Sequence, residues 1–326
     1  MKKYSYKNWV WILMLFLMAH ALSWILYVNI LSAGSLQRQK MVLLEMPKNK
    51  SAKIWIMGDS HPMLGINPDF IPGSFNLAST SEYYFLTELK LKQLLSSGQK
   101  PEILILPFDP HSFSAQGNSL LLGHELDDYF WSGILSPEKI SSKKLPTKFN
   151  RWWVGATFFP YAGQFFSLAA WKKTSPFKLE ENGFAPSEEN LSSIGKPSMN
   201  FQAQARFNAH FAGHNLHDSL QFSALESILF ECSKNGIQVV FVSYPLSDDY
   251  RNLAEISGME NQIQLAFHKI KNPPIWLDYA SLFKGKPEYF SDADHLNRNG
   301  AEILSRKIKT KLDSLRKTPD ARPQAI

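Results

Sequence analysis

A serine and a histidine near opposite ends of the chain have the residue types and surroundings needed for nucleophilic catalysis. Ser60 follows Gly-Asp directly after the apolar run 54–57, and His295 closes an Asp-x-x-His motif that begins at Asp292. A serine in a sharp turn after a buried strand exposes its hydroxyl, and an Asp-x-x-His loop presents an imidazole backed by a carboxylate. The two motifs together predict a serine triad.

Each motif alone is also typical of an ordinary turn, where Gly permits unusual dihedrals and Asp and Ser bond nearby amides. Their context favours chemistry, because the first motif ends a predicted strand and the second directly precedes a predicted helix. A hydroxyl is a poor nucleophile until a base removes its proton, and an imidazole with a pKa near ~6.5 does so at neutral pH. The conjunction of the motifs therefore predicts catalysis.

On these motifs the chain resembles the SGNH/GDSL hydrolase superfamily, which has a GDS block near the start of its domain and a closing Asp-x-x-His. More narrowly, the layout looks like the membrane-anchored SGNH-like proteins of bacterial envelopes that O-acetylate polysaccharides. The resemblance covers residues 52–110 and 236–314. It implies that Ser60 is the nucleophile, His295 the general base and Asp292 the residue that orients the base.

Two departures from the superfamily pattern concern the oxyanion hole. The second block of the superfamily usually supplies a glycine N–H, whereas residues 75–81 here are Phe-Asn-Leu-Ala-Ser-Thr-Ser. The third block has an Asn after a strand, whereas the run 103–106 leads into Pro-Phe-Asp-Pro-His. Losing one oxyanion donor can cost ~2.7–4 kcal/mol. The candidate replacement donors are the Ser60 amide, an amide within Ser79–Ser81, and the Asn76 side chain.

Four further residues near the motifs are secondary candidates for the site: Asp59, His61, Asp109 and His111. Asp109 and His111 form a second Asp/His pair at a strand end. Some alginate-acetylation proteins, which the chain resembles in this respect, use a separate Asp-x-His with a distant serine, so this pair is an alternative base or a substrate contact. His61 is either a substrate contact or a turn residue.

Two other sets of residues are expected to lie outside the chemistry. Asp294 competes with Asp292 for the orienting role, but a solvated loop charge or a helix N-cap is the expectation, because a helix dipole favours a carboxylate near the helix start. His210, His214 and His217 have the spacing of metal ligands on a helix face. They lack an adjacent acidic ligand, so a solvated polar face is expected. No metal and no cofactor is predicted.

The composition is that of a globular protein. The 326 residues are 44% hydrophobic and 20% charged with a net charge of +6, which suits one large domain or a domain with an insertion. The single cysteine, Cys232, excludes an intramolecular disulfide and is expected in the core. No stripe of basic and aromatic residues suggests nucleic acid as a partner. The tail 317–326 is expected to be disordered.

The N-terminus predicts a membrane anchor. Residues 9–31 are mostly apolar and follow three lysines. About 20 such residues span a bilayer, and the positive flank stays in the cytoplasm. Residues 1–8 are then cytoplasmic, residues 32–51 form a stalk, and the domain faces the periplasm or exterior of a bacterial cytoplasmic membrane. A cleaved signal peptide is the alternative, although the stretch exceeds the usual h-region of about 7–15 residues.

The rest of the chain predicts an α/β fold. Buried strands are expected at the apolar runs 54–57, 103–106, 239–244 and 275–277. Helices are expected at 83–95, 248–270 and 301–316. This alternation predicts a parallel sheet sandwiched by helices, with the site beyond the carboxyl ends of the strands. By resemblance, this is an SGNH-like, flavodoxin-like arrangement.

An aromatic-rich segment, 112–235, interrupts the alternation and predicts a helical insertion within the domain 52–316. Its aromatic side chains are expected to pack in a core, with a carbohydrate platform or a docking face for a membrane partner as the alternative. The uncharged stretch 152–171 is long enough to cross a bilayer. A second crossing would separate Ser60 from His295, so a buried or interfacial helix is expected.

The resemblance implies extracytoplasmic O-acyl transfer, with acetyl as the expected group. The acyl group would come from a donor or a multi-span membrane acyltransferase partner and pass through acyl-Ser60 to an envelope or secreted glycan. A carbohydrate or lipid esterase is the first alternative, since both enzymes share the acyl-serine and differ in the acceptor. A non-catalytic docking subunit of the same fold is the second, supported by the missing oxyanion Asn. Fold alone does not establish function.

Overall fold

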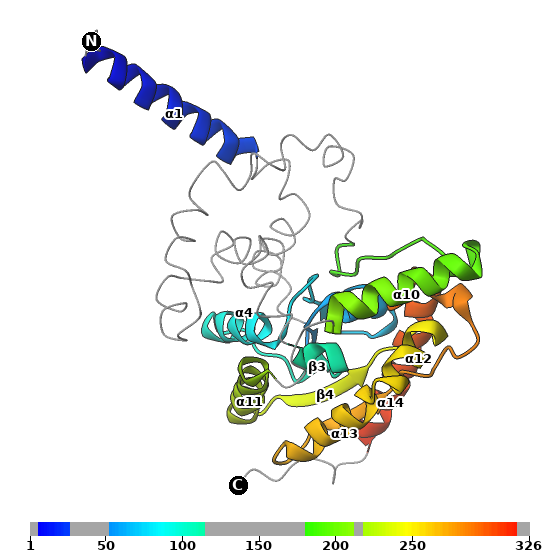
Figure 1. The fold of residues 1–326 in the computed structure, drawn as a ribbon. Coiled ribbons are helices and arrows are strands. Elements are labelled where there is room, and N and C mark those ends of the chain that lie inside the picture. The colour runs from blue at the N-terminus through cyan, green and yellow to red at the C-terminus, as the bar shows by residue number, and fades with distance from the viewer. Residues whose placement is uncertain (1–5, 27–51, 115–179, 212–217, 318–326) are drawn as a thin grey trace. The chain divides into compact units, whose positions relative to one another are not determined.

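The computed structural model describes residues 6–26, 52–114, 180–211 and 218–317 (Figure 1). Contacts divide the chain into two compact units, and the described part of the first is helix α1 (Tyr6–Leu26), which exposes apolar side chains such as Trp9 and Leu13. Within the described ranges, no helix has the length and apolar character required to cross a bilayer. The anchor at residues 9–31 stays a prediction.

The second unit is built on a five-stranded sheet whose strand order is β2-β1-β3-β4-β5. Every pair of neighbouring strands is parallel, and Ile54 of β1 aligns with Ser74 of β2 and Ile103 of β3. The strands are β1 (Ile54–Ile56), β2 (Ser74–Asn76), β3 (Ile103–Pro107), β4 (Gln238–Ser243) and β5 (Ile275–Asp278). The α/β class with a parallel sheet is confirmed.

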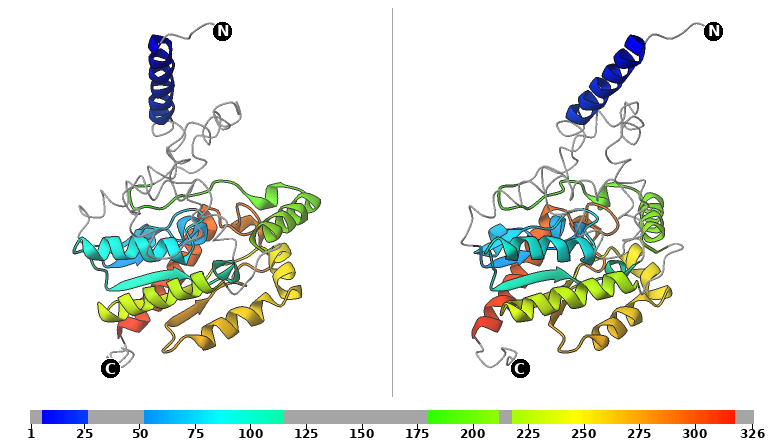
Figure 2. Two further views of the ribbon diagram at one scale, coloured as in Figure 1. Left: turned by 60° about the vertical axis from the view of Figure 1, so that its left-hand side comes forward. Right: turned by 90° about the vertical axis from the view of Figure 1, so that its left-hand side faces the viewer.

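Helices cover both faces of this sheet (Figure 2). The α-helices are α3 (Ser60–Gly65), α4 (Tyr84–Ser96), α10 (Lys196–Phe211), α11 (Ser219–Lys234), α12 (Asp248–Ile256), α13 (Met259–Lys269) and α14 (Arg298–Lys317). Short 3₁₀ turns are η2 (Pro68–Phe70), η3 (Pro110–Phe113), η5 (Leu191–Ser193) and η6 (Pro287–Tyr289). Helices α4 and α11 lie on one face and α14 on the other.

The apolar stripe of α14 forms one half of the core. Leu304, Ile308 and Leu312 recur at four-residue spacing and belong to the same buried cluster as Ile54 and Ile105. Four-residue spacing gives one helix face, and successive strand residues alternate between sheet faces. Each of these fully buried side chains contributes roughly 1.5–3 kcal/mol relative to exposure. This packing fixes α14, and with it the loop that precedes it, against the sheet.

The helix predicted over 248–270 is two helices, so that prediction is wrong in this respect. The chain leaves α12 at Ser257 and starts α13 after Gly258, which has φ +70°. This left-handed conformation ends a helix and is readily adopted only by glycine. Strand β2 was not predicted, because Ser74, Phe75 and Asn76 form no apolar run.

The predicted insertion is only partly described. Residues 115–179, including the uncharged stretch 152–171, lie outside the described residues, as does the tail beyond Lys317. Helix α11 (Ser219–Lys234) packs against α4 and leads directly into β4, which is the position of a crossover helix of the sheet. Cys232 on this helix is buried as expected, and burial raises the pKa of its thiol to about 12.

Candidate active site

A tight turn between β1 and α3 presents Ser60. Gly58 has φ +121°, and a Cβ at this position would lie 2.4 Å from Cδ of Pro107, so only glycine fits. Asp59 caps the helix, because its Oδ1 accepts a hydrogen bond of 2.9 Å from the main-chain N–H of His61. Ser60 is therefore the first residue of α3, partly exposed at the carboxyl end of the sheet.

The loop before α14 presents His295. Oδ1 of Asp292 accepts the main-chain N–H of Asp294 at 3.0 Å and that of His295 at 2.9 Å. Oδ2 of the same carboxylate lies 2.9 Å from Nδ1 of His295. Because an ionised carboxylate only accepts hydrogen bonds, Nδ1 carries the proton and Nε2 is the free acceptor. Asp292 thus shapes the loop and sets the imidazole tautomer.

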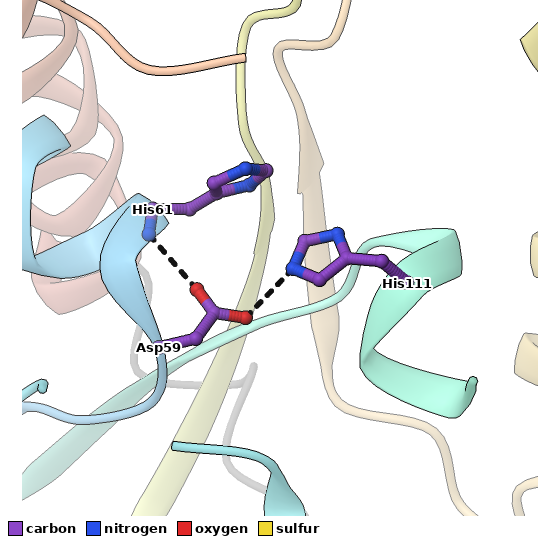
Figure 3. Close-up of side chains that lie close together, drawn as sticks. All are labelled: Asp59, His61 and His111. Atoms are coloured by element: carbon purple, nitrogen blue, oxygen red, sulfur yellow. Dashed lines mark hydrogen bonds and ion pairs between the residues drawn. The ribbon is translucent and has the colours of Figure 1, made fainter. Parts of the chain in front are cut away.

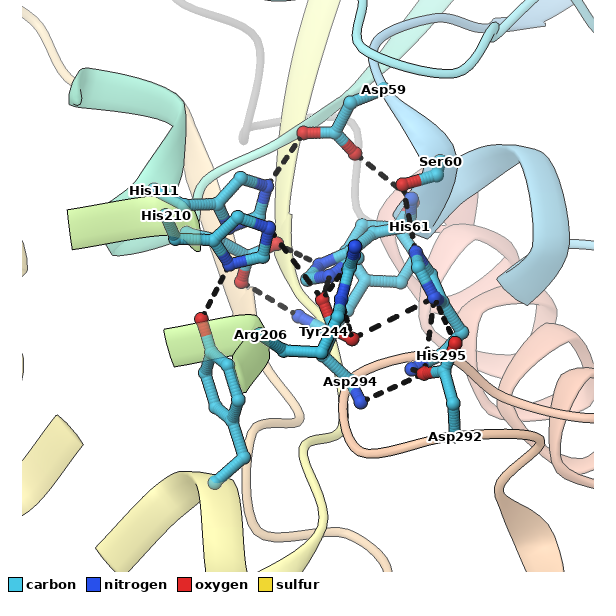
Figure 4. Close-up of polar contacts among 12 residues, drawn as sticks. Asp59, Ser60, His61, His111, Arg206, His210, Tyr244, Asp292, Asp294 and His295 are labelled. Atoms are coloured by element: carbon cyan, nitrogen blue, oxygen red, sulfur yellow. Dashed lines mark hydrogen bonds and ion pairs between the residues drawn. The ribbon is translucent and has the colours of Figure 1, made fainter. Parts of the chain in front are cut away.

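The two segments meet at Ser60 (Figure 4). Oγ of Ser60 lies 2.8 Å from Nε2 of His295, although the residues are 235 positions apart in the sequence. A general base must lie about 2.6–3.2 Å from the atom whose proton it takes. The structure therefore brings together the three residues of the predicted triad, Ser60, His295 and Asp292, in the order nucleophile, base and orienting carboxylate.

The Asn76 side chain is committed to the protein interior. Its Nδ2 donates to the carbonyl oxygens of Pro62 and Ile66, each at 2.8 Å, and its Oδ1 accepts from the amide of Ala78 at 3.1 Å. An amide group has two N–H donors, and both are used. The sequence-based suggestion that Asn76 donates to an oxyanion is therefore wrong: this side chain holds α3 against β2.

The loop after β2 retains two amides as oxyanion candidates. The amide of Ser79 donates to the carbonyl of Gly58 at 2.9 Å, which removes that amide from the set. Ser81 has φ +58°, a left-handed conformation that is uncommon for residues other than glycine and concentrates at functional sites. The remaining candidates are the amides of Ser60, Thr80 and Ser81. A buried ion pair between Lys90 and Glu82 stabilises this loop.

The four secondary candidates form a buried cluster. Figure 3 shows three of them, Asp59, His61 and His111. Nε2 of His111 lies 2.8 Å from Oδ2 of Asp59. Nδ1 of His61 lies 2.9 Å from Oδ2 of Asp109, whose Oδ1 accepts the main-chain N–H of Tyr244 at 3.0 Å. The alternative base His111 thus pairs with the carboxylate beside the nucleophile, while His295 holds the position at Ser60.

Charges within this cluster stabilise one another. Burial alone would raise the pKa of Asp59, but the charge and hydrogen bond of His111, together with His61, hold it well below its usual range. Burial alone would lower the pKa of His61, but its contacts with Asp109 and Asp294 raise it well above the usual value. His61 is only 3% exposed and lies in the first turn of α3, so its side chain is part of the buried cluster.

Helix α10 adds an arginine that the sequence analysis did not identify. Nε and Nη2 of Arg206 lie 2.7 and 2.8 Å from the two oxygens of Asp294, forming a two-pronged ion pair. Asp294 is only 1% exposed, so the expectation of a solvated charge or helix N-cap is wrong. Burial alone would raise the pKa of Asp294, but His295, His61 and Arg206 hold it well below its usual range.

The same helix adds His210. A solvated polar face was expected for this residue, but its side chain is buried. Its Nδ1 lies 2.6 Å from the hydroxyl of Tyr250, and its ring stacks on that of His111 with centroids 4.8 Å apart. Burial, reinforced by the charge of His111, lowers its pKa well below the usual value. Arg206 and His210 are four residues apart on one helix face, a spacing that could have indicated a shared role. The other two histidines of the set, His214 and His217, lie outside the described residues.

Two overlapping groups have side chains of the types that bind metal ions. Asp59, His61 and His111 form one group, and His61, Asp294 and His295 the other; within each, one ligand atom per residue lies within 4.8 Å of the others. Nitrogen and carboxylate oxygen are ligands for zinc and related ions. The imidazoles of the first group already bond carboxylates at 2.8–2.9 Å, so a metal would have to displace those hydrogen bonds.

Comparison with known proteins does not indicate a chemistry for this site, because no family model and no curated protein sequence matches the chain. The chemistry is therefore inferred from the atoms of the site. A hydroxyl, an imidazole acceptor and a carboxylate arranged in sequence are the groups that nucleophilic acyl transfer requires. They lie at the carboxyl edge of a parallel sheet, where α/β proteins place their sites.

Proposed function

We propose that this protein is a serine-dependent O-acyltransferase that transfers an acyl group, in the simplest case acetyl, to a hydroxyl of an envelope or secreted glycan. The observation that carries the proposal is the 2.8 Å separation of Ser60 Oγ and His295 Nε2, with Asp292 2.9 Å from Nδ1. These distances are those of an activated serine and its general base. Membership of the SGNH/GDSL superfamily is part of the same proposal.

The reaction has two halves. Nε2 of His295 takes the proton of Ser60 while Oγ attacks the acyl carbonyl, and the bond to the donor breaks as His295 returns the proton to the leaving group. His295 then takes a proton from a sugar hydroxyl, whose oxygen attacks acyl-Ser60, and returns that proton to Oγ as the bond between Oγ and the acyl carbon breaks. Asp292 stabilises the imidazolium formed in each half. The developing oxyanion would be bound by the amides of Ser60 and of Thr80 or Ser81.

The proposed location is the outer side of a bacterial cytoplasmic membrane. The three lysines before residues 9–31 and the apolar composition of this segment support an anchor with the domain outside. Acyl donors are made in the cytoplasm, so an external acyltransferase needs a membrane-embedded partner that delivers the acyl group. A reporter enzyme fused after Lys317 is expected to be active only outside, and cytoplasmic activity would contradict this location.

The test of the nucleophile uses a fluorophosphonate, which labels activated serines covalently. The full chain is expected to be labelled, and Ser60→Ala is expected to lose all labelling while keeping its melting temperature, because one partly exposed hydroxyl contributes little packing. The matched control is Ser96→Ala, an exposed serine on α4. Unchanged labelling of Ser60→Ala would refute the proposal, and full glycan acylation in cells carrying only this variant would favour a docking subunit.

The acceptor separates a transferase from an esterase. The enzyme is first acylated with an activated acetyl ester and then offered water with or without an envelope glycan. Acetylated sugar that accumulates faster than free acetate supports the transferase. Free acetate alone, with no dependence on the glycan, identifies an esterase that uses the same acyl-serine.

A further inference from the structure

We propose that His61, the residue after the nucleophile, is a positioning residue that is positively charged at neutral pH and fixes the loop of Asp292 and His295 to the turn of Ser60. This role rests on the acyl transfer proposed above. It assigns a function to a residue that the triad alone does not need.

His61 connects three segments of the fold (Figure 4). Its main-chain N–H donates to Asp59 at the turn after β1, and its Nδ1 lies 2.9 Å from Oδ2 of Asp109 after β3. Its Nε2 lies 3.5 Å from Oδ2 of Asp294, in the loop before α14. Because each ring nitrogen faces a carboxylate, which only accepts hydrogen bonds when ionised, the contacts favour an N–H at both positions and hence an imidazolium.

The surroundings of His61 are rich in negative charge. The groups that face it directly are Asp59, Asp109, Asp294, the rings of His111 and His295 at 4.5 and 5.4 Å, and the ring of Tyr244 at 5.8 Å. Helix α10 adds Arg206 and His210, which contact Asp294 from the other side. Burial alone would lower the pKa of His61, but its carboxylate partners raise it well above the usual value.

His61 affects the reaction through Asp294. Oδ1 of Asp294 lies 3.7 Å from Nδ1 of His295, the nitrogen that Asp292 binds at 2.9 Å. Asp294 therefore competes with Asp292 for the base. The charge of His61, together with Arg206, holds Asp294 away from His295. Loss of that charge would free Asp294 to turn the ring, and a misplacement of 1 Å at a reacting group can cost on the order of 10²-fold in rate.

The charge can be observed without any assay of activity. In the full chain with ¹⁵N-labelled histidine, His61 is expected to show two ring N–H groups at pH 8, and the His61→Gln variant assigns its signals. His268, exposed on α13 and away from the site, is the internal reference for the histidine signals. A neutral His61 ring at pH 8 would overturn the proposal.

Two uncharged variants separate the charge from the individual contacts. His61→Asn places an amide near the position of Nδ1 and can still bond Asp109, whereas His61→Gln places one near Nε2 and can still bond Asp294. Both are expected to slow fluorophosphonate labelling of Ser60 by on the order of 10²-fold, and His268→Gln is expected to have no effect. A wild-type rate in either variant would overturn the proposal, because one contact without the charge would then suffice.

The pH profile excludes a merely structural role. The wild-type labelling rate is expected to fall at alkaline pH as His61 loses its proton, and this fall is expected to be absent in both variants, measured below their melting temperatures. An alkaline fall that persists in the variants would assign it to another group and overturn the proposal. If wild-type Ser60 is not labelled at all, the acyl-transfer function fails, while the histidine spectrum still decides the charge of His61.

Discussion

Two of the Asp–His pairs near Ser60 have hydrogen bonds of nearly equal length, but they differ in sequence separation, burial and contact with the serine. Asp292 and His295 are three residues apart on one loop, with Oδ2 to Nδ1 at 2.9 Å, and the Asp292 side chain is 34% exposed. Asp59 and His111 are 52 residues apart and buried, with Oδ2 to Nε2 at 2.8 Å. Only the first pair reaches the serine hydroxyl. A short Asp–His bond is therefore a poor sign of a catalytic base; contact with a nucleophile is the better one.

The orientation of each imidazole explains the difference. His295 bonds its carboxylate through Nδ1, so Nε2 is left as an acceptor for Ser60. His111 bonds its carboxylate through Nε2, and its ring lies between those of His61 and His210. The first pair can take up and return a proton, whereas the second holds the N-cap of α3 in place.

The largest expected effect comes from replacing each histidine by glutamine. His295→Gln removes the base and is expected to slow labelling of Ser60 by on the order of 10²- to 10⁴-fold. His111→Gln keeps a donor near Nε2 for Asp59 and is expected to slow it less than about tenfold, since it removes no proton acceptor in the reaction. Labelling rates of the two variants, measured under identical conditions, test this difference. Equal losses in the two variants would remove the distinction between the pairs.

For stability the ranking of the two pairs is expected to be reversed, with a larger loss for replacing Asp59 than for replacing Asp292. Asp59→Asn keeps the capping oxygen but loses the charge opposite His111, at an expected cost of about 1–3 kcal/mol in the free energy of unfolding. The side chain of Asp292 is partly exposed, so Asp292→Asn is expected to lower the free energy of unfolding by less than about 1 kcal/mol through the lost charge. Urea unfolding measures both. Labelling is expected to suffer more in Asp292→Asn, where the imidazole tautomer is no longer fixed.

The same contrast limits what the sequence alone could predict. Ser60 and the Asp-x-x-His loop were predictable because each is a local motif next to a strong strand or helix signal. Arg206 could not be found in this way, because its partner Asp294 is 88 residues away and only the packing of α10 brings them together. The candidate triad and the residues Asp59, His61, Asp109 and His111 could be named from the sequence, whereas the buried ion pair of Arg206 with Asp294 could not.

The fold shows the same division between local and long-range information. The strands β1, β3, β4 and β5 were predicted because each contains an apolar run, as expected of strands in a parallel sheet covered on both faces. Strand β2 has three residues and depends on pairing with β1 for its conformation. The commitment of Asn76 to the carbonyls of Pro62 and Ile66 likewise depends on how α3 folds back, which no local pattern specifies.

Acid is expected to destabilise the protein through His210, which stacks on His111 of the buried cluster. Burial lowers the pKa of His210 well below the usual value of ~6.5. Just below that pH, His210 is therefore protonated in the unfolded state and neutral in the folded state. Its contribution to stability is present above the unfolded pKa and is lost as pH falls below ~6.5, at up to ~1.36 kcal/mol per pH unit. His210→Gln is expected to flatten this part of the curve in urea unfolding between pH 7 and 5. A slope equal to that of the wild type would contradict the assignment.

The smallest expected effect tests the outermost contact of the buried cluster. The Tyr250 hydroxyl lies 2.6 Å from Nδ1 of His210 and joins α12 to α10. Tyr250→Phe removes this bond without changing the ring, so an expected loss of about 0.5–1.5 kcal/mol in the free energy of unfolding follows from one buried hydrogen bond. Tyr279→Phe, at a half-buried tyrosine after β5, is the control. Labelling of Ser60 is expected to stay unchanged in Tyr250→Phe, because this contact lies beyond His111 and touches neither the base nor the nucleophile. A slowed rate with unchanged stability would instead extend the catalytic network from His295 out to α12.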